Sequence, residues 1–215
     1  MQEQSIFFDA GELKLEGMFL PAPSDAPHPA AVICHPHPAY GGTMDNNVVM
    51  GVTRALHKTG HSTLRFNFRG VGASEGQYSG GVAEVDDVRA AIEFMQIKSG
   101  GRDVPIVLAG YSFGSWVAAN ALEGDSSISH VILVSPPTSM FDFSHLSKDG
   151  VERARHVIVG DRDQFCDRAV LQELFDQLPE PKTLRVIPHA DHFLFGREQA
   201  LTEAVIETVS DHSAA

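Results

Sequence analysis

Cysteine and basic side chains are scarce in this sequence of 215 residues. Only Cys34 and Cys166 are present, without the C-x-x-C spacing of a redox or zinc motif, so we expect two reduced thiols instead of a disulfide framework. The 16 Lys and Arg residues are outnumbered by 28 Asp and Glu residues, which gives a formal net charge of −12. Because phosphate backbones and anionic lipids bind clustered cations, we expect no nucleic-acid partner and no membrane partner.

Long apolar segments are missing as well. No run approaches the roughly 18 uninterrupted apolar residues of a spanning helix, and residues 1–5 lack the basic start of a signal peptide. We therefore expect a cytoplasmic protein. The length is typical of one domain, so we predict a single domain over residues 1–215, present as a monomer or a small homo-oligomer.

Short apolar runs alternate with amphipathic stretches along most of the chain, which predicts strands alternating with helices. The expected strands cover 30–34, 62–66, 105–109, 130–134, 156–159 and 183–187, and the expected helices cover 48–57, 82–96, 112–122, 169–178 and 197–209. Residues 5–20 alternate in polarity and predict a hairpin or a pair of edge strands, and the proline-rich residues 21–29 predict a loop. This order indicates an α/β fold with a mainly parallel sheet, helices on both faces and an antiparallel N-terminal edge.

The pattern G-x-S-x-G occurs twice, around Ser74 and around Ser112. A nucleophile elbow requires a strand, a sharp turn and then directly a helix, with small residues around the serine. Ser112 has this context, because an apolar run precedes it and a helical stretch starts at it. The pattern around Ser74 ends at Gly76 and is followed by Gln-Tyr-Ser-Gly-Gly, where no helix can start. We therefore predict Ser112 as the nucleophile and Ser74 as a loop residue; for Ser112, a tight turn without reactivity is the alternative.

A serine hydroxyl becomes a nucleophile only beside a base that is itself oriented by an acid. One recurrent chain order of this triad is serine, acid, histidine, and the sequence supplies candidates in that order. Asp161 and Asp163 follow the apolar run 156–159, and His189 and His192 follow the run 183–187. We favour His192 as the base, because it directly precedes the apolar residues that lead into the last predicted helix.

The loop after the apolar run 30–34 begins His35-Pro36-His37-Pro38. A loop at this position provides one of the two amides that stabilise an oxyanion, and the residue after the nucleophile provides the other. Proline has no N–H and is excluded. The backbone amides of His37 and Phe113 are therefore the candidate oxyanion hole, with a merely stiffened turn as the alternative.

Five motifs now stand in chain order, HPHPxxGGTMxN, NFRGVGxSxG, GYSFG, GDRD and ADHF. Over about residues 30–196 they resemble an α/β-hydrolase, similar to the small, capless, dienelactone-hydrolase-like serine esterases of bacteria that carry the His-Pro-His-Pro signature. The resemblance implies a three-layer α/β-hydrolase fold and a triad of Ser112, Asp163 and His192, with Asp161 as the reserve acid. Dienelactone hydrolase itself has cysteine in the elbow, so the serine here argues against carrying over its substrate.

The expected activity is that of a carboxylesterase-like serine hydrolase, which cleaves small esters or thioesters through an acyl-enzyme on Ser112 and needs no cofactor. Segment 135–155 is too short for a cap domain, so we expect an open pocket for short acyl groups. The candidate pocket residues are Tyr40, Tyr111, Met140, Phe141 and Phe143. The apolar residues of segment 135–155 could instead form a small core under a loop.

Several alternatives use the same residues. Peptidases, thioesterases, lactonases and perhydrolases share the triad, and a protein of this fold can bind a small molecule or a partner without turnover. The pairs His189-x-x-His192 and His35-x-His37 lack the further ligands of a zinc site, so we expect no metal. The loop 70–76 reads G-x-G-x-x-x-G, one residue longer than a dinucleotide fingerprint, and opens no helix, so we expect no nucleotide.

Overall fold

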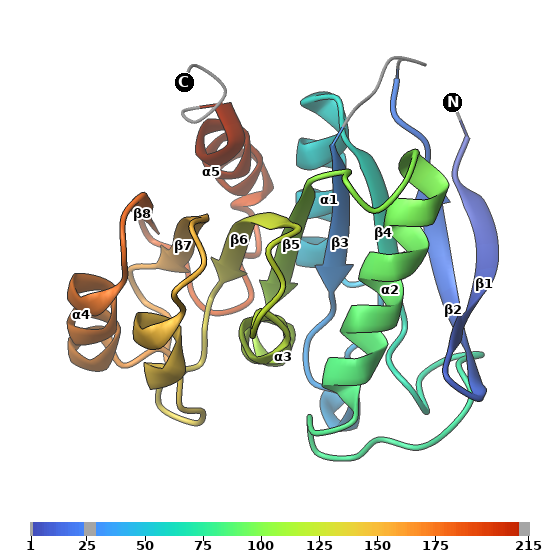
Figure 1. The fold of residues 1–215 in the computed structure, drawn as a ribbon. Helices are drawn as coiled ribbons and strands as arrows, with labels where there is room; N and C mark the ends of the chain where they lie inside the picture. The colour runs from blue at the N-terminus through green and yellow to red at the C-terminus, as the bar shows by residue number, and fades with distance from the viewer. Residues whose placement is uncertain (1, 24–28, 211–215) are drawn as a thin grey trace.

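The computed structural model describes residues 2–23 and 29–210 and contains one eight-stranded sheet (Figure 1). The strand order is β1-β2-β4-β3-β5-β6-β7-β8. The pairs β1–β2 and β2–β4 are antiparallel, whereas all other neighbouring pairs are parallel. The predicted mainly parallel sheet with an antiparallel N-terminal edge is therefore confirmed.

The eight strands are β1 (Gln4–Ala10), β2 (Leu13–Leu20), β3 (Ala30–Cys34), β4 (Ser62–Phe66), β5 (Ile106–Tyr111), β6 (Ile128–Val134), β7 (Ala154–Gly160) and β8 (Lys182–Ile187). Every residue of β3, β4, β5 and β7 is buried, as expected for strands covered on both faces. The edge strand β8 is only half-buried. The continuous apolar runs of β3 and β5 therefore predict these two strands from the sequence, whereas β4 also buries polar side chains.

The helices are α1 (Asn47–Lys58), α2 (Glu84–Ser99), α3 (Phe113–Ala121), α4 (Arg168–Gln177) and α5 (Glu198–Ser210), with short 3-10 turns at Pro38–Tyr40 and Ser144–Lys148. Two of them have side-chain caps that fix where they begin. Asn46 accepts a hydrogen bond from the amide of Val48, and Asp167 accepts from the amides of Ala169 and Val170.

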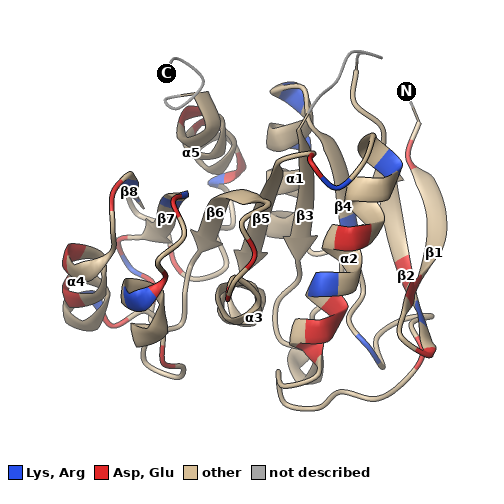
Figure 2. Ribbon diagram, viewed as in Figure 1, with Lys and Arg blue, Asp and Glu red and all other residues tan. Residues whose placement is uncertain are grey.

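Two hydrophobic cores lie on opposite faces of the sheet. One is built with α1 and α5, and the other with α2, α3 and part of α4, as the layers in Figure 1 show. Helix α3 carries no charged residue and is covered closely, whereas the charged residues gather on the outer helices and loops (Figure 2). This burial holds the start of α3 rigidly at the carboxyl end of β5.

Many element boundaries differ from the prediction by one to three residues, and three of these differences have local reasons. The strand before Ser112 continues through Tyr111, and the helix after it starts at Phe113, because Ser112 has a left-handed φ of 54°. The helix predicted from residue 82 starts at Glu84, whose buried carboxylate accepts hydrogen bonds from the amides of Ser79 and Gly81. Of the predicted loop 21–29, residues 24–28 lie outside the described part of the chain.

Candidate active site

Ser112 lies at a sharp turn between β5 and α3. Its backbone angles, φ 54° and ψ −123°, are strained for a residue other than glycine. The flanking glycines allow this turn by permitting close backbone approach: a Cβ on Gly110 would lie 2.2 Å from the carbonyl oxygen of Gly114, and a Cβ on Gly114 would lie 2.5 Å from the carbonyl oxygens of Cys34 and His35. The elbow therefore requires glycine at positions 110 and 114, because a Cβ atom does not fit at either.

The structure brings Ser112, His192 and Asp163 together from three distant parts of the chain. The Nε2 atom of His192 lies 2.9 Å from the Oγ of Ser112. Its Nδ1 atom lies 2.9 and 3.0 Å from the two carboxylate oxygens of Asp163. His192 and Asp163 are both buried. A hydroxyl, an imidazole and a carboxylate therefore form one continuous chain of hydrogen bonds.

Neighbouring groups hold the imidazole and the carboxylate in place. One oxygen of Asp163 also accepts a hydrogen bond from the amide of Phe165, whose ring meets the His192 ring edge-on at 4.8 Å. The hydroxyl of Tyr111 donates to the carbonyl of His192 over 3.0 Å, and burial raises the pKa of Tyr111, which keeps this donor protonated. The base is thus restrained at both its ring and its backbone.

The second acid and the second histidine lie apart from this chain. Asp161 is exposed, and hydrogen bonds from the backbone amides of His189 and Ala190 lower its pKa. His189 is exposed and contacts the guanidinium of Arg162 through its Nδ1 at 2.9 Å. Both residues organise the loop that carries His192, and neither is paired with Ser112.

The loop after β3 presents the amide of His37 beside the start of α3. His35 fixes its direction: the ring Nδ1 donates to the carbonyl of Pro36 over 2.6 Å, and Nε2 accepts from the amide of Phe68 over 3.1 Å. The Pro36 carbonyl and the His37 amide belong to one trans peptide group and point in opposite directions. The His37 N–H therefore points away from the buried ring of His35.

The His37 side chain is occupied by structural contacts. Its Nδ1 accepts from the amide of Ala39 over 3.1 Å, so Nε2 carries the proton and donates to the hydroxyl of Tyr78 over 3.0 Å. Burial lowers the pKa of His37, which favours this neutral form. Its ring also packs on Phe113 at 4.8 Å. The amide of Phe113 belongs to the first turn of α3, where N–H groups have no partner within the helix.

A cavity of about 580 Å³ opens over Ser112. Its lining consists of Pro36, His37, Tyr40, Gly41, Gly42, Asn46, Tyr111, Ser112, Phe113, Pro137, Met140, Phe141, Phe165, His192 and Phe193. Four of the five predicted pocket residues are among them. Sequence reasoning did not single out Phe165 and Phe193, although each lies within two residues of a triad candidate, which is the signal that could have identified them.

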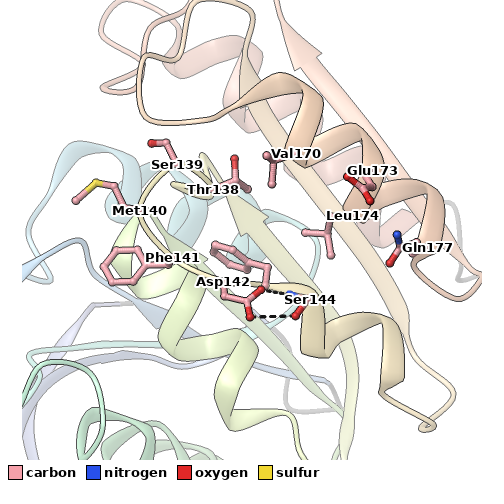
Figure 3. A pocket seen from close by; sticks show the side chains of 11 residues that line it. Thr138, Ser139, Met140, Phe141, Asp142, Ser144, Val170, Glu173, Leu174 and Gln177 are labelled. Atoms are coloured by element: carbon pink, nitrogen blue, oxygen red, sulfur yellow. Dashed lines mark hydrogen bonds between the residues drawn. The ribbon is translucent and has the colours of Figure 1, made fainter.

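Phe143 does not line this cavity, so its prediction as a pocket residue is wrong. Its side chain is 3% exposed and packs into the core beside α3. It lines a second cavity of about 490 Å³ between segment 138–144 and α4, which shares Met140 and Phe141 with the first. There Asp142 accepts hydrogen bonds from the amide and hydroxyl of Ser144 (Figure 3). That turn, together with the 3-10 turn that follows, directs Phe143 inward while Met140 and Phe141 stay at the active-site cavity.

The two cysteines lie away from solvent, and no metal-ligand cluster is found in the described residues. Cys34 and Cys166 are free thiols, as predicted, and the structure shows that both are buried. Burial raises the pKa of Cys166 to about 11. Within residues 2–23 and 29–210 no three His, Cys, Asp or Glu side chains cluster as metal ligands would. In the same residues, no helix is both long and apolar enough to cross a bilayer.

Residues 29–214 match the family described as Alpha/beta hydrolase domain. The chain belongs to this α/β-hydrolase family. Its eight-stranded sheet with an antiparallel edge is the fold of its structural neighbours, among which are an α/β serine hydrolase homologue and a serine hydrolase without lid. The match places this α/β-hydrolase among hydrolases, as the sequence motifs predicted.

Similar proteins come from several bacteria. A solved α/β serine hydrolase homologue from Coxiella burnetii is 32% identical, covers 97% of this chain and 98% of its own, and superposes with a TM-score of 0.87. A serine hydrolase without lid from Xanthomonas campestris is 29% identical, with coverage of 100% and 97% and a TM-score of 0.87. An uncharacterised protein of Rickettsia prowazekii is 32% identical over 208 residues, which are 93% of this chain and 86% of the relative.

Proposed function

We propose that this α/β-hydrolase is a carboxylesterase-like serine hydrolase that cleaves small carboxylic esters or thioesters through an acyl-enzyme on Ser112. The observation that carries the proposal is the unbroken contact from the Ser112 hydroxyl through His192 to Asp163, with separations of 2.9 Å at each step. These separations lie in the range in which a base can take a proton directly.

In the first half of the reaction His192 removes the proton of Ser112 as its oxygen attacks the substrate carbonyl. Asp163 accepts a hydrogen bond from the Nδ1–H of the imidazole and stays ionised, which leaves Nε2 free as the base and stabilises the imidazolium that forms. The amides of His37 and Phe113 receive the negative charge on the carbonyl oxygen. Each such donor contributes about 3 to 4 kcal/mol to the stability of the transition state. The imidazolium then protonates the leaving alcohol or thiol.

In the second half water hydrolyses the acyl-enzyme. His192 takes a proton from water, the hydroxide oxygen attacks the acyl carbonyl, and the same two amides stabilise the second tetrahedral intermediate. The acid product leaves, and Ser112 recovers its proton. An open cavity over Ser112 supports this step, because water must reach the ester bond from the solvent side.

The test is hydrolysis of p-nitrophenyl acetate together with labelling by a fluorophosphonate. We expect Ser112→Ala to lower kcat by at least about 10⁴ and to abolish labelling, because the nucleophile is lost. Ser74→Ala is the matched control, since Ser74 sits in the other G-x-S-x-G pattern, and we expect it to keep both activities. Hydrolysis by Ser112→Ala at the rate of the wild-type protein would disprove the proposal.

A further inference from the structure

The cavity over Ser112 is unusually poor in charge. Among its lining residues in the described part of the chain there is no Asp, Glu, Lys or Arg. Six of them are aromatic: Tyr40, Tyr111, Phe113, Phe141, Phe165 and Phe193. A ligand in this cavity would therefore contact mainly rings, the Met140 thioether and proline.

Most of the polar side chains that line the cavity are already hydrogen-bonded. The Tyr111 hydroxyl donates to the His192 carbonyl, and the Asn46 side-chain oxygen accepts from the Val48 amide at the start of α1. The ring nitrogens of His37 are bonded to Ala39 and Tyr78. The amides assigned to the oxyanion serve the carbonyl under attack. The remaining side-chain donors, the Tyr40 hydroxyl and the Asn46 NH2 group, are neutral, so they bring no positive charge to balance a second negative charge on a substrate.

The charge of the whole protein acts in the same direction. Its formal net charge is −12, and Figure 2 shows acidic residues spread over the outer helices. A substrate carboxylate would therefore be repelled on approach and would lose its hydration inside an apolar cavity without a counter-ion. Both costs vanish for an uncharged substrate.

We propose that the site is selective for uncharged, apolar esters and rejects substrates that carry a carboxylate. The proposal rests on the proposed function, because it concerns what the same nucleophile can reach. It separates this protein from enzymes that hold an anionic substrate with an arginine or lysine in the pocket. It also identifies Met140, Phe141, Phe165 and Phe193 as the side chains that contact the non-reacting part of the substrate.

The experiment compares two esters of matched shape, 4-nitrophenyl 6-methylheptanoate and mono-4-nitrophenyl adipate. Their acyl chains differ only in an isopropyl end against a carboxylate end, and spontaneous hydrolysis is subtracted with Ser112→Ala. We expect kcat/KM of the wild-type protein to be at least roughly 100-fold higher for the neutral ester, because burying a carboxylate without a counter-ion has a large desolvation cost. Equal values for the two esters, or a preference for the adipate, would overturn the proposal.

A variant that adds the missing cation sharpens this test. Met140 is 51% exposed at the cavity wall, so a longer side chain can be accommodated there. We expect Met140→Arg to lower the neutral-to-anionic ratio by roughly tenfold at low salt and less at high salt, because the attraction is screened. Met140→Gln is the neutral control for the lost apolar contact, and we expect it to lower the ratio less than Met140→Arg does and without a dependence on salt. A ratio lowered equally by Gln and Arg would contradict a charge-based origin.

The two proposals fail in distinguishable ways. If wild-type protein hydrolyses neither these two esters nor p-nitrophenyl acetate faster than Ser112→Ala does, the proposed function is wrong. If it hydrolyses both at the same rate, the function stands and the selectivity is wrong. If Met140→Arg does not fold, the wild-type ratio alone still decides.

Discussion

The two G-x-S-x-G loops share a sequence pattern and have opposite chemistry. Ser112 is half-buried at a strained turn, and its hydroxyl faces the imidazole of His192 at 2.9 Å. Ser74 is buried, and its hydroxyl donates to the carbonyl of Asn67 over 2.7 Å and accepts from the amide of Glu16 over 2.9 Å. The Ser112 hydroxyl is directed at an imidazole, whereas the Ser74 hydroxyl is hydrogen-bonded to backbone groups.

The glycines of the two loops also have different roles. Gly110 and Gly114 have ordinary backbone angles and are needed because other backbone atoms lie too close for a Cβ. Gly72 and Gly76 have positive φ values of 59° and 83°, which glycine adopts easily. The comparison teaches that the same motif gives a strained turn with the serine hydroxyl directed at an imidazole only where a helix follows directly.

The largest effect should come from removing the group that orients the base. Asp163→Asn should lower kcat by roughly 10⁴, because an amide in place of the carboxylate favours the wrong tautomer of His192 and cannot stabilise its protonated form. Asp161→Asn should stay within about threefold of wild type, since this exposed side chain bonds only the backbone of the next loop. Steady-state kinetics on p-nitrophenyl acetate measure both. A large loss in Asp161→Asn with little loss in Asp163→Asn would reverse the assignment of the acid.

A smaller effect should follow from filling the space beside each serine. Gly114→Ala places a Cβ 2.5 Å from the carbonyl oxygens of Cys34 and His35, which pushes the elbow away from the His37 loop. A misplacement of that kind costs roughly 100-fold in kcat/KM. Gly72→Ala also creates contacts of 2.5 Å, but to the side chains of Asn67 and Glu16.

Gly72→Ala is the control for this prediction. We expect it to lower the free energy of unfolding by about 1 to 3 kcal/mol while leaving kcat within twofold, because the strain stays in the Ser74 loop. Chemical denaturation and esterase kinetics on both variants separate the two effects. The comparison breaks if Gly72→Ala loses as much activity as Gly114→Ala.

Much of this arrangement could be predicted from the sequence, because the signals are local. The strand β3 is a run of five buried residues, and the elbow follows a strand and opens a helix, so periodicity and turn chemistry identify both. The order of serine, acid and histidine then fits the carboxyl ends of β5, β7 and β8, which lie at one edge of the sheet.

The parts that escaped prediction depend on long-range contacts. Segment 135–150 has no helical or strand period, so the sequence could not tell that Phe141 faces the cavity and Phe143 the core. Likewise, no pattern reveals that the ring of His35 bonds an amide 33 residues away, at Phe68. Side-chain direction in irregular segments is set by packing, which the local sequence does not encode.

The smallest expected effect concerns His35, which joins the loop of His37 to the beginning of the Ser74 loop. Burial lowers the pKa of His35 to about 4, against an ordinary 6.5, although the Pro36 carbonyl works in the opposite direction. A proton on Nε2 would face the Phe68 N–H and break that hydrogen bond. Because the unfolded chain takes up this proton near pH 6.5, the stabilisation is complete above that pH and is lost as the pH falls toward 4.

Between pH 7 and pH 5 this linkage should remove about 2 kcal/mol from the free energy of unfolding. Urea denaturation of wild type and His35→Gln at both pH values isolates the effect, because the carboxylates that titrate in the same range are common to both proteins. The variant should be less stable than wild type at pH 7 and should lose less stability on acidification. If the two proteins lost the same free energy of unfolding, His35 would not be the neutral group that connects the His37 loop to the Ser74 loop. The different arrangement of the two loops would then need another explanation.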